Sequence, residues 1–242
     1  LFAAFMLCAT ISASHANASD LFQPLVMNGH PVRWFPNRAG QVVLSYAIAR
    51  SEMAFDDAIN CKRIRQPRDM LEKSGIDAEH FRSALKLAFS SWERAANMRF
   101  VEIDDPSKAA IVIGEQVVPQ GYAFPNVTPG TRVLDGYSEI KRAQVCLNPM
   151  RKWKIGFDGD RAVYDLQYTL THEIGHAIGL DHPVARGQLM SFRYDETLHG
   201  LSSGDIAGAE FVYGARREAH GTQQQANDNH DRAPTNAHAM AN

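Results

Sequence analysis

The segment from Thr171 to His182, THEIGHAIGLDH, contains three histidines whose spacing combines a helical turn with a bend. On a helix, His172 and His176 lie one turn apart, so both imidazole rings leave the same face and can reach one cation. A continuing helix would carry His182 away from that cation, so the chain must bend before it. Gly179 allows this bend because it adopts positive φ at little cost. The spacing therefore predicts that the three histidines bind one metal ion.

This ligand set favours a catalytic zinc ion. Three neutral imidazoles suit Zn²⁺ and leave a fourth position for water, whereas a structural zinc site is closed by a fourth protein ligand. A bound zinc ion lowers the pKa of its water towards about 7 and polarises a carbonyl group. Glu173, beside the first ligand, is placed to accept a proton from that water. We therefore expect one Zn²⁺ ion, with Glu173 as the general base of a hydrolase.

Apolar residues around the motif predict the helix that carries it. Leu166, Leu170, Ile174 and Ile178 recur every four residues and would bury one face of a helix over residues 164–180. The metal ligands and the core contacts thus occupy different positions. HExxH alone also occurs by chance on protein surfaces, but a glycine and a third histidine in register weigh against that alternative.

Periodicity predicts the other regular elements. β-Branched runs predict strands at 41–48, 99–103 and 109–114. Apolar residues recur at three- and four-residue steps from Phe81 to Ala96, which predicts an amphipathic helix capped by Ser74 or Asp77. This order of strand, helix, strand, strand predicts a mixed α/β layer.

The second half of the chain adds an irregular segment and a last helix. Residues 121–136 are rich in Gly and Pro, which predicts a loop with an irregular edge strand. Ser202 and Asp205 have the spacing of a capping box, and the helix that they begin should end before Gly214. No internal repeat and no second apolar core follow, so we expect one domain over residues 41–214.

The two ends of the chain have different compositions. An apolar run followed by Ala16-Asn17-Ala18 predicts a secretory signal peptide over residues 1–18, too short to span a bilayer. A short extension, 19–40, would then precede the domain. Residues 215–242 contain no Leu, Ile, Val, Phe, Tyr or Trp, which predicts a disordered, solvated tail. The tail histidines, which fit no compact metal site, are His220, His230 and His238.

Charge and cysteine content limit the class of protein further. The chain has 25 Lys and Arg against 27 Asp and Glu, which argues against a nucleic-acid-binding surface. After removal of the signal peptide, Cys61 and Cys146 would remain in an oxidising compartment, where we expect them to form a disulfide. Two free thiols are the alternative. A loop of this length would stabilise the fold by about 4 to 5 kcal/mol.

Taken with the zinc motif, the sequence resembles the metzincin metallopeptidases and, within them, the matrixins. Residues 188–191 (QLMS) follow the third histidine where metzincins place the Met-turn, which implies that Met190 lies beneath the zinc. Residues 201–214 are similar to the matrixin C-terminal helix, and 89–114 to its first helix and sheet. The resemblance implies an α+β fold: a twisted, mixed five-stranded sheet above a cleft, an active-site helix, a C-terminal helix, and substrate bound as an extended strand.

The sequence also departs from the matrixin pattern. Pro183 follows the third histidine at a position where matrixins have Ser, and a proline there is more like the serralysins. The tyrosine ligand of serralysins is missing, however, because Phe192 stands at its position. Tyr194 matches a tyrosine in the S1′ wall of matrixins. With Phe192 it either shapes a hydrophobic specificity pocket or packs in the core. No matrixin cysteine-switch motif occurs, and Cys61 inside the domain is a poor substitute.

Further metal sites have less support in the sequence. No histidine lies between positions 80 and 172, so the three-histidine structural zinc site of vertebrate matrixins cannot be built there. Calcium ligation or helix capping are the alternatives for Asp158, Asp160 and Asp165. Their spacing lacks an EF-hand register, which favours capping.

These observations predict a secreted or periplasmic zinc endopeptidase that acts on protein or peptide substrates. We expect a monomer without a stable membrane anchor and without a nucleic-acid partner. The alternative is a zinc-stabilised, non-catalytic extracellular binding module of the same fold. Glu173 favours catalysis, because a structural zinc ion has no need of the adjacent carboxylate.

Overall fold

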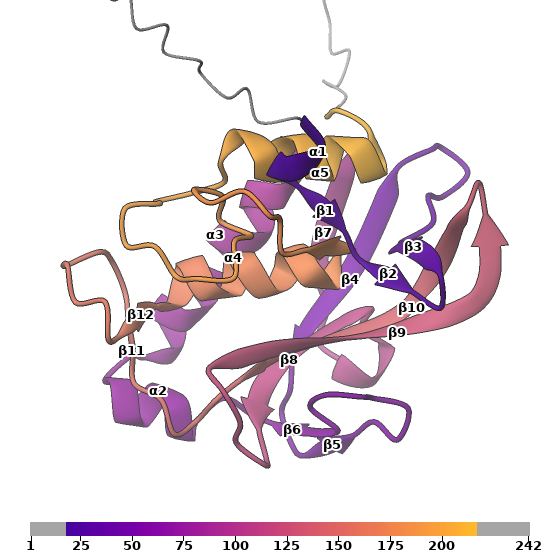
Figure 1. The fold of residues 1–242 in the computed structure, drawn as a ribbon. Coiled ribbons are helices and arrows are strands. Elements are labelled where there is room, and N and C mark those ends of the chain that lie inside the picture. The colour runs from indigo at the N-terminus through magenta and orange to yellow at the C-terminus, as the bar shows by residue number, and fades with distance from the viewer. Residues whose placement is uncertain (1–17, 217–242) are drawn as a thin grey trace, which may run out of the picture.

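A mixed β-sheet forms one layer of the molecule, and long helices pack against it (Figure 1). The computed structural model describes residues 18–216. Its five longest strands are β4 (Val42–Ile48), β7 (Met98–Glu102), β8 (Ile111–Gln116), β9 (Ala123–Leu134) and β10 (Tyr137–Leu147). They follow the order β7-β4-β8-β10-β9, with β9 antiparallel to β10 and the other neighbours parallel. The expected α+β fold with a mixed sheet is confirmed.

Eight short strands extend this sheet or pair outside it. β3 (His30–Arg33) joins β10, β2 (Val26–Met27) joins β3, β6 (Arg63–Arg65) joins β8, and β5 (Met53–Ala54) joins β6. Separate pairs are β1 (Gln23–Pro24) with β13 (Leu180–Asp181), and β11 (Trp153–Lys154) with β12 (Tyr164–Asp165). Strands β1 to β3 lie in the segment expected to be a short extension, so this segment is folded onto the rest of the molecule.

The segment 121–136 corrects one expectation. Most of it is strand β9, twelve residues long, rather than a loop. Pro125 and Pro129 cannot donate to a ladder, and they fit here because β9 pairs with β10 on one side only. Register shifts interrupt the pairing near Ile140. The expected edge position and irregularity are therefore present, but the expected loop is wrong.

Five α-helices and one 3₁₀ turn complete the described residues. They are α1 (Ala18–Leu21), α2 (Asp69–Ser74), α3 (Ala78–Ala95), η1 (Pro106–Lys108), α4 (Leu166–Ala177) and α5 (Ser203–Tyr213). The Asp77 carboxylate accepts from the His80 amide and caps α3, which decides between Asp77 and Ser74. The capping box at Ser202 is formed.

Helices α3 and α4 cover one face of the sheet and share a core with it. Leu85, Phe89 and Trp92 of α3 are almost fully buried, as are the four apolar residues that recur from 166 to 178. The Trp92 indole N–H donates to the Thr171 carbonyl oxygen at 2.9 Å. The helix that carries the histidine motif is therefore fixed by both apolar packing and a buried hydrogen bond.

A disulfide joins Cys61 to Cys146 of β10, with the two Cα atoms 6.3 Å apart. It lies in a second, smaller apolar cluster that includes Phe55 and Ile64. The bond therefore links the segment around β5 and β6 to the sheet. No helix among residues 18–216 is long and apolar enough to cross a membrane. Residues 1–17 of the expected leader and 217–242 of the expected tail, with its three histidines, lie outside the described residues.

Candidate metal centre

The three histidines of the motif converge. The Nε2 atoms of His172, His176 and His182 are each 3.2 Å from the other two. Nitrogen ligands placed 2.0–2.1 Å from a tetrahedral centre would be about 3.3 Å apart. Within residues 18–216 no other group of histidine, cysteine or acidic side chains meets in this way. The donor set and its spacing therefore fit one zinc ion.

Hydrogen bonds to backbone carbonyls fix the orientation of two of these rings. His172 Nδ1 lies 2.8 Å from the Leu189 oxygen, and His176 Nδ1 lies 2.7 Å from the Leu180 oxygen. An Nδ1–H donated to each carbonyl leaves the lone pair on Nε2, which is the form that binds a metal. Burial, with repulsion between the rings, lowers the pKa of His172 well below its usual value and that of His176 to about 4. Both imidazoles are therefore neutral near pH 7.

The chain bends where the sequence places Gly179. This residue has φ +95°, and its amide donates to the His176 carbonyl oxygen at 2.9 Å. A Cβ atom at this position would overlap the Val32 carbonyl oxygen. Both the dihedral angle and the contact thus require glycine. Helix α4 ends at Ala177, three residues before the predicted end, and the bend returns His182 to the other two rings.

The amino-terminal segment, residues 20–34, braces this bend. We call this segment the strap. Strand β1 pairs with β13, which directly precedes His182. The Leu25 amide donates to the Gly179 oxygen at 2.8 Å, and the Ala185 amide donates to the Asp20 oxygen at 3.0 Å. The strap therefore satisfies backbone groups on both sides of the third histidine.

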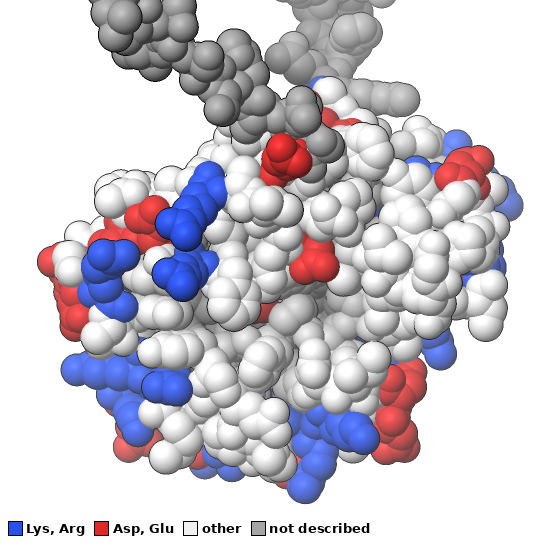
Figure 2. All heavy atoms as spheres, viewed as in Figure 1, with Lys and Arg blue, Asp and Glu red and all other residues white. Residues whose placement is uncertain are grey.

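Glu173 is buried beside the ligands. Burial raises the pKa of Glu173 to about 8, and its Oε2 atom has no hydrogen-bond partner among the described residues. Buried carboxylate oxygens normally have partners, so an exception points to a ligand or a chemical role. Glu173 and the three histidines line one cavity of about 390 Å³. Figure 2 shows this face of the molecule hollowed near its centre, over α4.

Met190 lies under α4. A Cβ atom at Gly175 would overlap the Met190 sulfur, so the thioether packs against the helix between the first two ligands. The buried Asp205 carboxylate accepts from the Leu189 amide at 2.8 Å and the Met190 amide at 2.9 Å. Sequence reasoning assigned Asp205 only to the cap of α5. The capping box is the one sequence signal that points to Asp205, and it does not reveal that the same carboxylate also binds the amides of Leu189 and Met190.

Aromatic side chains form one wall of the cavity. Phe192 is 79% exposed and meets the His182 ring edge-on at 5.1 Å, so it does not pack in the core. Tyr194 is half-buried and stacks on Tyr164 at 4.3 Å, which stacks on Tyr122 at 4.2 Å. All four line the cavity. Tyr122 and Tyr164 were not predicted, because stacking between distant segments leaves no local pattern.

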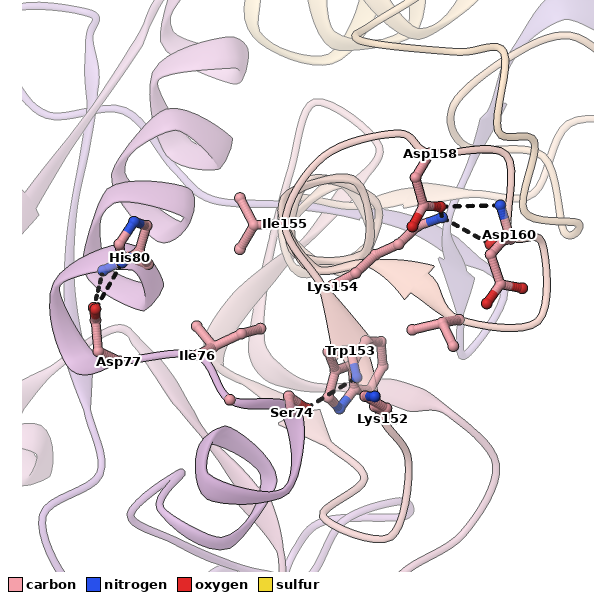
Figure 3. A pocket seen from close by; sticks show the side chains of 12 residues that line it. Ser74, Ile76, Asp77, His80, Lys152, Trp153, Lys154, Ile155, Asp158 and Asp160 are labelled. Atoms are coloured by element: carbon pink, nitrogen blue, oxygen red, sulfur yellow. Dashed lines mark hydrogen bonds and ion pairs between the residues drawn. The ribbon is translucent and has the colours of Figure 1, made fainter.

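The three aspartates considered as calcium ligands have protein partners. Asp165 caps α4 by accepting from the Tyr168 amide at 2.6 Å. Asp158 pairs with Lys154, and the Asp160 carbonyl accepts from the same ammonium group at 2.7 Å (Figure 3). A lysine ammonium thus lies where these oxygen atoms converge.

Comparison with known proteins places this geometry in a family. The family model described as Matrixin matches residues 68–214, more than half of the chain. A serralysin of Photorhabdus sp. (strain Az29) is 36% identical over 110 residues, 44% of this chain and 21% of that protein. Metalloendoproteinase 1-MMP of Arabidopsis thaliana is 28% identical over 145 residues, 57% of this chain and 39% of that protein. Human matrix metalloproteinase-20 is 26% identical over 139 residues, 55% of this chain and 28% of that protein.

The matched region thus spans less than half the length of each of these relatives. The family match covers the helix α4, the three converging histidines and α5. On this match, together with the fold and the zinc-type ligand set, the chain belongs to the matrixin family.

Proposed function

We propose that this protein is an endopeptidase that hydrolyses peptide bonds in protein or peptide substrates, with one zinc ion held by His172, His176 and His182. The observation that carries the proposal is the convergence of three neutral imidazoles beside an unpaired, buried Glu173 carboxylate in an open cavity. When bound, zinc supplies a Lewis acid that acidifies water and polarises the substrate carbonyl.

The chain's own residues supply the proton transfer. Glu173 accepts a proton from the attacking water at its carboxylate and passes it to the departing amine, as a general base and then a general acid. Met190 supports the site from below α4 without contacting the substrate.

The sheet edge and the aromatic wall would bind the substrate. Strand β9 pairs with β10 on one side only, and residues 121–125 line the cavity. A peptide can therefore add to this edge as an extended strand. Phe192 and Tyr194 would shape a hydrophobic S1′ pocket beside the reacting bond. Export of the protein by the predicted leader, to the periplasm or outside the cell, is part of the same proposal.

The test is cleavage of quenched peptides by the purified protein, before and after chelation and zinc add-back. Glu173→Gln should lower kcat by about 10² to 10⁴, because the general base is lost, while bound zinc per protein stays unchanged. Activity that survives this substitution would overturn the proton-transfer role. Zinc binding without cleavage across a diverse peptide library would instead favour the non-catalytic binding module.

A further inference from the structure

A second hollow adjoins the catalytic cavity. It has a volume of about 350 Å³ and lies between the turn after His182 and the segment after Met190. The two hollows share Ser191, Phe192 and Tyr194 as a common wall. A peptide bound in the catalytic cavity can therefore extend past these three residues and place a neighbouring side chain in the second hollow.

Three arginines from separate parts of the chain line this hollow. They are Arg161, Arg186 and Arg193, and we call them the arginine cluster. All three are exposed, and none forms an ion pair with a carboxylate of residues 18–216. Figure 2 shows basic side chains above and to the left of the central hollow, over the loops that Figure 1 draws beside α4. Among residues 18–216 the cluster is therefore a site of net positive charge next to the catalytic residues, with Asp195 close enough to Arg161 for that arginine to help lower its pKa.

Asp195 is the single acidic residue among those that line the hollow. Its carboxylate accepts from the Thr197 amide at 3.0 Å and from the Thr197 hydroxyl at 2.7 Å. Thr197, rather than an arginine, is therefore its hydrogen-bond partner. The hollow keeps an excess of positive charge although the chain as a whole has a formal net charge of −2.

Hydrogen bonds give the hollow a fixed frame. The Ser191 amide donates to the Gln188 oxygen at 3.0 Å, and the Ser191 hydroxyl donates to the Ala185 oxygen at 3.2 Å. The Ala185 amide is held in turn by Asp20 of the strap. The backbone that carries Arg186 and Arg193 is thus ordered before any substrate arrives, which lowers the entropy cost of binding.

We propose that the arginine cluster is a substrate subsite that binds a carboxylate, so that the enzyme prefers peptides with Asp or Glu close to the cleaved bond. The inference rests on the proposed peptidase function and names its substrate class. A guanidinium group binds a carboxylate through two parallel hydrogen bonds. Three such groups, none of them ion-paired within residues 18–216, match an acidic peptide, and a cluster this small does not match the long phosphate track of a nucleic acid.

The experiment uses pairs of quenched peptides of one sequence that differ only by Glu or Gln at one position near the cleaved bond. For at least one position, kcat/KM should be about tenfold higher with Glu, mostly through a lower KM, and the preference should shrink as salt rises. The combined substitution R161Q, R186Q and R193Q should abolish the preference and leave cleavage of the Gln peptide unchanged. R99Q, an exposed arginine on β7, is the matched control and should keep the preference.

The outcomes separate the two proposals. If the Gln peptides are cleaved but the wild type shows no Glu preference, or the triple variant keeps it, the arginine subsite is wrong and the peptidase proposal stands. If no peptide is cleaved, the peptidase proposal fails. The binding of the same peptides to the E173Q protein, measured by fluorescence anisotropy, then decides on the subsite. Equal affinities for Glu and Gln peptides would overturn it.

Discussion

At the scale of single residues, Asp205 performs two structural tasks with one buried carboxylate. It accepts from the Ser202 amide at 2.7 Å, which caps α5, and from the amides of Leu189 and Met190. Burial raises the pKa of Asp205, and the three donors oppose that shift. The segment beneath the metal ligands is thus held in place by the first turn of a helix that follows it in the sequence.

We predict that Asp205→Ala lowers the free energy of unfolding by about 2 to 4 kcal/mol, because three backbone amides lose their acceptor. Urea denaturation would measure the change. Asp205→Asn keeps one acceptor oxygen and should cost less. An alanine variant within about 0.5 kcal/mol of wild type would show that water replaces the carboxylate without penalty.

Lys154 also connects distant segments. Its side chain is 12% exposed, and its ammonium group donates to Asp158 and to the Asp160 carbonyl (Figure 3). The same ammonium group also donates to Glu196. The Glu196 carboxylate accepts as well from the hydroxyl of Tyr194, in the cavity wall. Lys154 and Glu196 are 42 residues apart, so sequence spacing could not reveal this pair.

This cluster predicts a defined pH dependence. Burial acts to raise the pKa of Glu196, but Lys154 and the Tyr194 hydroxyl outweigh it and lower that pKa; Lys154 also lowers the pKa of Asp158. A carboxyl group whose pKa is lower in the folded protein than in the unfolded chain stabilises the fold at pH values above its unfolded pKa of about 4. This stabilisation is lost as the pH falls through the pKa of the folded state. Lys154→Met should therefore destabilise the protein at pH 7 and much less near pH 3. Denaturation curves at both pH values, with exposed Lys152→Met as control, would test this. Equal losses at both would contradict it.

At the scale of elements, the sequence predicts best where one element contains its own signal. Helices α3, α4 and α5 are predicted by apolar periodicity and caps, and β4, β7 and β8 by short β-branched runs. Strand β10 was not predicted, although Asp135 and Gly136 have positive φ and form the turn that joins it to β9. This Asp-Gly pair is the local hairpin signal that points to the strand.

The site follows the same division. The convergence of the three histidines is predictable from the sequence because a helix and one glycine fix their spacing. The strap could not, because β1 and β2 are two residues long and leave no alternating pattern. Its partners, Gly179 and Ala185, become neighbours only in the folded chain.

We predict that the strap affects metal affinity. Leu25→Pro removes the amide that donates to the Gly179 oxygen, and zinc affinity should fall roughly 10-fold, as when other partners of a ligand shell are lost. Leu25→Ala keeps that amide and is the control for the lost side chain. Competition with a chromophoric chelator would measure both. Equal affinities for the two variants would show that the bend at Gly179 holds its shape without this hydrogen bond.

At the scale of the whole molecule, metal binding and folding are coupled. The three ligands meet only in the native fold, so zinc binds the folded state in preference to the unfolded state. Zinc at 100 times its dissociation constant should stabilise the protein by about 2.7 kcal/mol. A calorimetric scan should show a higher melting temperature with zinc and a lower one after chelation. Calcium is the control and should leave the melting temperature nearly unchanged, because Lys154 already pairs with Asp158. A larger effect of calcium than of zinc would contradict this.

The pairing of β1 with β13 joins the first strand of the described chain to the last one. A ribosome makes the strap long before it makes the strand that the strap must hold. Until residues 180–182 emerge, the strap has neither β13 nor the third imidazole to hold, whatever the state of the earlier strands. The nascent polypeptide therefore acquires its complete ligand set only after His182 has been synthesised, and shorter fragments cannot assemble the three-histidine centre.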